Sequence, residues 1–259
     1  MQPSAAVAQP HRPVVGVAVI GNEVLSAKIV DANGPLILDK LSAIGVRVAE
    51  LAIVPDDVPR IAQLVRTFAQ QFDWVITTGG VGPTHDDCTW RAVAQAFDLP
   101  IALHEQLAVR IAGHLGVTLS AEQQRLAMLP KGVEIIDGTG RWPLFRLRNV
   151  YVLPGVPALV ARNVAQICEI LRADGVLPDA LATVYLDVDE WHSVGHIDAV
   201  VAAHPAVSIG SYPVFDQADH RLRLTFEAAE TTDVQAALHT LAAAVGAEHV
   251  LRVTWRSAP

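Results

Sequence analysis

The stretch from Pro13 to Ile20 is continuously apolar and rich in β-branched residues, and it constrains the fold more than any other part of the chain. A strand with one face in water alternates apolar and polar residues, whereas a strand that is buried on both faces does not. The stretch therefore predicts a central strand of a parallel sheet that has helices on both sides. It is also far too short to cross a lipid bilayer as a helix.

Strands and helices alternate after this stretch. The expected elements are a helix over 23–44 that stops at Gly45, a strand over 47–54, a helix over 58–72 and a strand over 74–78. This alternation predicts an α/β fold with a doubly wound, mostly parallel sheet. Because such sheets bind ligands beyond the carboxyl ends of their strands, the loops after Ile20, Val54 and Thr78 form the candidate site.

The rest of the chain predicts more helices and short strands, followed by a second domain. In the first part we expect a helix over 89–97, a mostly helical stretch over 101–129, strands at 133–136, 144–148 and 150–153, and a helix that ends near 171. Turn residues gather over 174–179, which indicates a domain boundary. We therefore expect a flexible tail at 1–12, the α/β domain at 13–175 and a small α+β subdomain at 176–259. The subdomain is expected to contain strands at 182–188, 207–212, 221–228 and 250–253, and helices at 194–203 and 232–245.

Composition excludes several classes of protein. The 259 residues are 51% hydrophobic and 18% charged, which is typical of a globular protein and not of a disordered one. The formal net charge of -8 opposes binding to nucleic acid or to an anionic membrane. The two cysteines, Cys88 and Cys168, form no metal-binding or disulfide pattern, and we expect a cytoplasmic protein.

The loop after the strand at 74–78 carries the densest chemical signal. Gly79, Gly80 and Gly82 let the main chain bend and approach a ligand closely, so that successive N–H groups can converge on a phosphate. Thr78 and Thr84 add hydroxyl groups that can donate to the same anion. The loop is therefore a candidate phosphate site.

Two carboxylates, Asp86 and Asp87, follow the glycines and would repel a bare phosphate. They are compatible with a phosphate if they hold Mg²⁺ or another hard cation that also contacts phosphate oxygens. The alternative is structural, because either aspartate could cap the helix that begins near Thr89. Residue types alone do not decide between the two interpretations.

The histidines offer a weaker metal hypothesis. His192 and His196 have the i, i+4 spacing that places two ligands on one helix face, and Glu190 lies nearby. No HExxH motif accompanies them, so a solvated helix start is the favoured interpretation. His85 lies within the glycine loop, where it is either a proton donor or a spacer.

Four motifs, taken together, resemble a known family. They are Gly21 to Leu25 (Gly-Asn-Glu-Val-Leu), Ile29 to Asn33 (Ile-Val-Asp-Ala-Asn), Thr78 to Asp87 (Thr-Gly-Gly-Val-Gly-Pro-Thr-His-Asp-Asp) and Pro154 to Pro157 (Pro-Gly-Val-Pro). In this order they resemble the N-terminal domain of competence/damage-inducible protein A, within the MoaB/Mog-like molybdopterin-binding superfamily. The N-terminal domain of eukaryotic FAD synthase is similar. The resemblance covers about residues 14–255 and implies a three-layer α/β/α domain.

The resemblance also implies roles for individual residues. Asp87 and Asp56 match the family's catalytic aspartates, and with Asp86 they would hold a divalent metal such as Mg²⁺. The remaining positions would bind substrate, a nucleotide or a pterin phosphate: Thr78, Gly79, Gly80, Gly82, Thr84, Glu23, Asn33 and Gly155. For Asp56, the alternative is that it caps the helix at 58–72, although Asp57 could do so instead. For Glu23 and Asn33 the alternative is a solvated surface position, and for Gly155 a plain strand-to-helix turn.

The activity that the resemblance implies is metal-dependent hydrolysis of a nucleoside-diphosphate compound such as ADP-ribose or FAD. Two alternatives remain open: molybdopterin binding or adenylylation in molybdenum cofactor biosynthesis, and a non-catalytic binding module. The resemblance further implies a homo-oligomer. The sequence departs from the family between Asp137 and Phe145, where Trp142 and Leu144 replace small residues. The Trp142 indole would either narrow the pocket or stack on a base or pterin ring.

Overall fold

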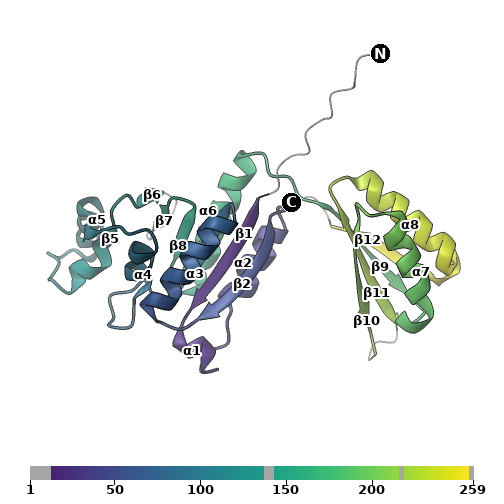
Figure 1. Ribbon diagram of the computed structural model, residues 1–259, viewed down its shortest axis with the longest axis horizontal. Coiled ribbons are helices and arrows are strands. Elements are labelled where there is room, and N and C mark those ends of the chain that lie inside the picture. The colour runs from purple at the N-terminus through teal and green to yellow at the C-terminus, as the bar shows by residue number, and fades with distance from the viewer. Residues whose placement is uncertain (1–12, 137–142, 216–218, 257–259) are drawn as a thin grey trace, which may run out of the picture. The chain divides into compact units, whose positions relative to one another are not determined.

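The computed structural model describes residues 13–136, 143–215 and 219–256 (Figure 1). The chain divides into two compact units, with the division between Val176 and Leu177. The expected tail at 1–12 and the position of Trp142 lie outside the described residues. Among the helices that are described, none is long and apolar enough to cross a membrane.

The first unit is built on a mixed sheet. Its strands are β1 (Val14–Ile20), β2 (Arg47–Val54), β3 (Trp74–Thr78), β6 (Glu134–Ile136), β7 (Leu144–Leu147) and β8 (Val150–Leu153). In the described residues they form six strands in the order β2-β1-β3-β8-β7-β6. The four strands β2, β1, β3 and β8 run parallel, whereas β7 and β6 are antiparallel to their neighbours. The mostly parallel sheet is as predicted.

Helices cover both faces of this sheet, as the apolar stretch at β1 predicts. Ala18 and Ile20 pack into one apolar core with α3 (Val58–Gln71) and α4 (Thr89–Ala96). Val15 and Val17 face the other way and pack with α2 (Asn33–Ser42) and α6 (Pro157–Ala173). The three layers explain why no polar residue interrupts β1.

One predicted helix is wrong. Instead of a single helix over 23–44, the structure has α1 (Asn22–Leu25) and then α2, with a turn between them. Pro35 has no N–H to donate and is tolerated only in the first turn of a helix, so a helix cannot run through it from 23. The carboxylate of Asp31 accepts hydrogen bonds from the N–H groups of Asn33 and Gly34 and starts α2 there.

The stretch at 101–129 is less helical than expected. It contains β4 (Ile101–Leu103), α5 (Glu105–Leu115), a 3-10 helix (Gln123–Ala127) and β5 (Met128–Pro130). β4 and β5 pair antiparallel as a separate small sheet. A three-residue strand is too short for its periodicity to be read from the sequence.

The second unit is a small α+β domain. Its elements are β9 (Ala180–Leu186), α7 (Glu190–Ala203), β10 (Ser208–Pro213), β11 (Leu222–Ala228), α8 (Thr231–Val245), a 3-10 helix (Ala247–His249) and β12 (Val250–Trp255). The described strands form an antiparallel sheet in the order β10-β11-β9-β12. Helices α7 and α8 lie together on one face of it (Figure 1). This matches the predicted subdomain, except that α7 begins four residues earlier than expected.

Candidate functional site

A cleft of about 620 Å³ lies at the carboxyl ends of three parallel strands of the first unit. The loops after β1, β3 and β8 line it, which is where a sheet of this kind is expected to bind a ligand. The lining residues that we predicted from the sequence are Glu23, Asn33, Thr78, Gly79, Gly80, Gly82, Asp87 and Gly155. Thr84, Asp56 and Asp86 are not part of the lining.

The glycine loop forms one wall of the cleft. Gly79 has φ 102° and Gly80 has φ 63°, a left-handed region that disfavours any residue with a Cβ. A Cβ on Gly80 would lie 2.6 Å from Thr89 Oγ1, and a Cβ on Gly82 would lie 2.6 Å from Asp87 Oδ2. Gly79 and Gly80 are therefore needed for the shape of the loop, whatever it binds, whereas a Cβ at Gly82 would meet only the end of the Asp87 side chain.

The N–H groups of the loop are available for a ligand. Within the described part of the chain, no group accepts a hydrogen bond from the N–H of Gly80, Val81 or Gly82. All three residues line the cleft. Consecutive main-chain N–H groups without an acceptor are the feature that a phosphate-binding loop requires.

The threonine hydroxyls are not available, which corrects part of the sequence interpretation. Thr78 Oγ1 donates to the carbonyl of Pro154 at 2.8 Å, and Thr84 Oγ1 donates to the carboxylate of Asp87. Thr89 Oγ1 donates to the carbonyl of Gly79 at 2.7 Å. These hydroxyls fix the loop within the protein and do not donate to a ligand.

Asp87 closes the loop on itself and does not cap the following helix. Its Oδ2 accepts the N–H of Thr84 at 2.8 Å, and α4 begins after Cys88 with no side-chain cap. The capping alternative for Asp86 and Asp87 is therefore not found. Asp86 is exposed to solvent.

The two aspartates after β2 have different roles. Asp57 Oδ1 accepts the N–H of Arg60 at 2.9 Å and caps α3, which leaves Asp56 free of that task. Asp56 Oδ2 instead accepts the N–H of Asn22, at 2.8 Å, in the loop after β1. Its Oδ1 lies 3.5 Å from the Cβ that Gly80 would carry. Asp56 therefore lies behind the cleft wall, between the loops after β1 and β3.

Asn33 connects two loops of the cleft. Its Nδ2 donates to Thr78 Oγ1 at 3.2 Å and to the carbonyl of Gly155 at 2.9 Å. A Cβ at Gly155 would lie 3.5 Å from the Cα of Gly79, which is an ordinary contact, so glycine is not required at this point. Asn33 is buried, so a solvated surface position, its alternative interpretation, is not found.

The sequence interpretation missed several lining residues. Asp31 and Asn33 both reach the cleft, although a regular helix through 31–33 would allow only one of them to do so. One side of the cleft is apolar, which the motifs did not indicate. This apolar side is formed by Ile29, Val30, Leu126, Val156 and Leu159. Leu144, which replaces a small residue of the family motif, is fully buried in the core beside α2 and α6.

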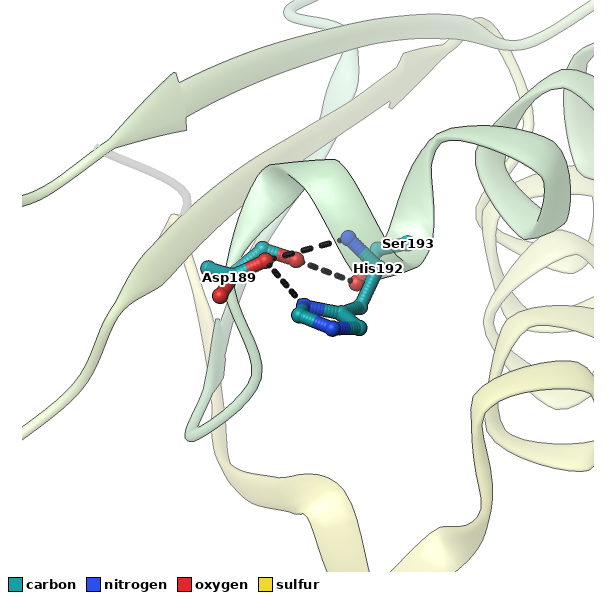
Figure 2. A network of polar contacts seen from close by, with 3 residues as sticks. All are labelled: Asp189, His192 and Ser193. Carbon is teal, nitrogen blue, oxygen red and sulfur yellow. Dashed lines mark hydrogen bonds and ion pairs between the residues drawn. The ribbon is translucent and has the colours of Figure 1, made fainter.

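The histidine pair in the second unit is not a metal site. Figure 2 shows that His192 and Ser193 turn toward Asp189, the residue that caps α7. Asp189 Oδ1 accepts the N–H of His192 at 3.0 Å and lies 2.7 Å from His192 Nδ1. Among the residues that the structure describes, no group of three His, Cys, Asp or Glu side chains is arranged to hold a metal.

Comparison with known proteins agrees with this architecture. The family described as "Probable molybdopterin binding domain" matches residues 16–173, which covers more than half of the chain. The chain belongs to this family. The second unit matches the family described as "FAD synthase, middle domain" over residues 178–254. The two matches meet at the division between the units, and both confirm the resemblance inferred from the motifs.

Individual relatives support the same assignment. A protein described as "Probable FAD synthase" from Caenorhabditis elegans is 28% identical over 90% of this chain and 50% of its own length. The chain thus spans about half the length of this FAD synthase relative. A CinA-like protein from Mycobacterium tuberculosis is 34% identical over 55% of this chain and 37% of its own length. The crystal structure of CinA from Thermoplasma acidophilum is similar with 25% identity and a TM-score of 0.55, covering 63% of this chain and 98% of that chain.

Proposed function

We propose that the molybdopterin-binding domain of this chain binds a nucleoside-diphosphate compound such as ADP-ribose or FAD and hydrolyses its diphosphate in a divalent-metal-dependent reaction. The observation that carries the proposal is the run of three cleft-lining residues, Gly80, Val81 and Gly82, whose N–H groups have no acceptor within the described part of the chain. Main-chain donors of this kind bind linked phosphates without a charged side chain.

The size and polarity of the cleft suit such a ligand. A volume of about 620 Å³ lies within the range of sites for small molecules and cofactors. The apolar side, with Ile29, Val30 and Val156, offers a surface for a flat heterocycle, and the glycine loop offers donors for the phosphates. A ligand with an aromatic ring at one end and a diphosphate beside it satisfies both parts.

Because the cleft lining is acidic, a bound diphosphate requires a cation to offset its charge. Glu23, Asp31 and Asp87 line it, and none of the described lining residues is a lysine, arginine or histidine. A diphosphate would meet three carboxylates with no positive side chain to offset them. Mg²⁺ is commonly held by one or two carboxylates together with substrate phosphates, so a site without three protein ligands is compatible with it.

Asp87 is the residue that would hold this cation, with Asp56 as a second ligand, whereas Asp86 lies outside the lining of the cleft. Asp87 lies in the cleft wall and Asp56 lies behind Gly80. When bound, a divalent cation neutralises phosphate charge and makes a water molecule more acidic. The protein's own contribution is to hold the diphosphate with the loop N–H groups, which donate more strongly as negative charge develops on the phosphate oxygens.

Release of AMP tests the proposal. The full chain is incubated with ADP-ribose or FAD in Mg²⁺ or in EDTA, and AMP is measured by chromatography. We expect release only with Mg²⁺, a loss of at least about 100-fold in Asp87→Ala, and no change in Asp39→Ala, an exposed carboxylate on α2 outside the cleft. Unchanged activity in Asp87→Ala would contradict the proposed role, and binding without AMP release would indicate a binding module.

The family assignment favours a second candidate, which is binding or adenylylation of a pterin phosphate. The same loop donors and apolar side would hold a pterin ring and its phosphate. The two candidates differ in their substrates. Hydrolysis acts on ADP-ribose or FAD, whereas adenylylation consumes ATP and requires the pterin to be present. Turnover of ATP with pterin, and no hydrolysis of ADP-ribose or FAD, would support the second candidate over the first.

A further inference from the structure

The outer edge of strand β12 is free in the second unit. β12 pairs with β9 on one side and has no partner on the other within the described residues. An exposed edge presents a row of unpaired N–H and C=O groups that can pair with another strand. Proteins commonly protect such edges with proline, lysine or a bulge. β12 contains neither proline nor lysine, and its pairing with β9 is irregular only between Val250 and Arg252, ahead of Val253. The opposite edge strand, β10, ends in Pro213.

Apolar side chains accompany this free edge. Val253 lies opposite Val184 and Trp255 lies opposite Ala182, so both share the face of the sheet that carries the core. Val184 and Ala182 are fully buried, whereas Val253 is 40% and Trp255 is 41% exposed. Leu251, two residues before Val253, is 47% exposed. The core of the second unit therefore continues to the edge of the sheet and is left half open there.

The other face of β12 carries no charge that would oppose pairing. Its only charged residue is Arg252, whose guanidinium lies 3.9 Å from the centre of the Tyr185 ring and 3.4 Å from Asp219. Thr254 follows on the same face and lies opposite Thr183. A strand that approaches this edge meets one partnered arginine and one threonine.

We propose that β12 pairs antiparallel with β12 of a second copy of this chain, about a two-fold axis at Val253, so that the two four-stranded sheets become continuous. The sequence of the strand is complementary to itself in this register. Val253 lies opposite its own copy, and Arg252 lies opposite Thr254. Apolar residues meet apolar residues on the core face, and no like charges face each other on the other side.

A lysine substitution tests the interface by oligomeric state. The mass of the full chain is measured by light scattering or sedimentation over a dilution series, with circular dichroism to check folding. We expect a dimer that Val253→Lys converts to a monomer and that Val201→Lys leaves intact. Val201 is a matched control, because it is 45% exposed on α7, away from β12. A monomeric parent protein, or a Val253→Lys protein that is folded and still dimeric, would overturn the proposal.

Cysteine substitution tests the register and does not depend on the lysine variant. Residues directly opposite in an antiparallel pair have Cα atoms about 4.5 to 5.5 Å apart, within reach of a disulfide. Val253→Cys is therefore expected to form a disulfide-linked dimer on mild oxidation. Thr254→Cys is not, because its own copy lies diagonally at about 7 to 8 Å. The native Cys88 and Cys168 are buried. Equal cross-linking of both variants, or of neither, would contradict this register.

Discussion

Asn33 Nδ2 donates a 2.9 Å hydrogen bond to the carbonyl oxygen of Gly155, which lies 122 residues further along the chain. The same nitrogen donates to Thr78 Oγ1. One amide thus joins the start of α2 to the loops after β3 and β8. The two walls of the cleft are held at a fixed separation by a side chain that itself lies almost out of contact with water.

Replacing Asn33 by leucine is expected to destabilise the first unit. Gly155 and Thr78 would lose a donor in a buried position, which costs about 1 to 3 kcal/mol. Asn163→Leu is the matched variant, because within the described residues neither polar atom of the buried Asn163 side chain has a partner. That substitution is expected to leave stability unchanged or raise it. Urea denaturation measures both, and equal losses in the two variants would contradict this account of Asn33.

Gly79→Ala is expected to abolish ligand binding and lower the free energy of unfolding by more than about 1 kcal/mol. Its φ of 102° is unfavourable for alanine, and the added Cβ would collide with the carbonyl oxygen of Ile20. Gly113→Ala is the control, because no atom lies within 4 Å of a Cβ at that position of α5. It is expected to gain about 0.5 to 1 kcal/mol. Thermal denaturation measures the stability of the two variants, and calorimetric titration measures their binding of ADP-ribose.

Substitutions of Asp56 and Asp57 are expected to have different effects on stability and on AMP release, although the two residues are adjacent in the sequence. Asp57→Ala removes the cap of α3 and is expected to cost about 1 kcal/mol of stability with no loss of AMP release. Asp56→Ala removes the acceptor of the Asn22 N–H beside the glycine loop and is expected to lose AMP release. Denaturation midpoints and the chromatographic assay measure the two effects. The distinction would fail if Asp57→Ala lost AMP release at a temperature where it is folded.

The first turn of α7 is expected to loosen in acid. The hydrogen bond from the His192 side chain, then the bond from its N–H, lowers the pKa of Asp189 in the folded protein. A carboxyl with a lowered pKa stabilises the fold above its unfolded pKa, and this stabilisation is lost as the pH falls through the folded value, below about pH 4. Hydrogen exchange of the α7 amides should therefore accelerate in that range.

Asp189→Asn supplies the control for this pH dependence. Asparagine still accepts the N–H of His192 as a cap but does not titrate, so exchange in α7 should become insensitive to acid over the same range. Asp198→Asn, on the same helix and without a partner among the described residues, should keep the acid response of the parent protein. An acid response that persists in Asp189→Asn would assign the effect to another group.

The sequence indicated the ligand-facing edge of the sheet because of local patterns. An uninterrupted apolar stretch at β1 requires burial on both faces, and parallel strands place their following loops at one edge. The glycines at 79, 80 and 82 indicated a bent loop, and the positive φ found at Gly79 and Gly80 favours glycine at those two positions. The part of the cleft lining formed by Thr78, Gly79, Gly80, Gly82 and Asp87 followed from these two facts.

The failures have a common cause. The prediction of a single helix over 23–44 rested on the spacing of apolar residues. It did not take account of Pro35, which is tolerated only in the first turn of a helix. The threonine hydroxyls of the glycine loop were expected to donate to a ligand, yet the tertiary structure brings carbonyl and carboxylate acceptors to them first. Leu144 replaces a small residue of the family motif, and the motif did not indicate that the direction of its strand puts it in the core.

By itself the sequence determined the order of the elements, the two-unit organisation and the loop that must bend, because these depend on neighbouring residues. Only the tertiary structure decided which groups remain free to act. It paired Asp57 with α3 and Asp56 with the loop after β1, and it joined Asn33 to Gly155. Among the described residues, it left the N–H groups of Gly80, Val81 and Gly82 without acceptors. A hydrogen bond between residues 122 positions apart depends on where two strands end in space, and no local pattern encodes that distance.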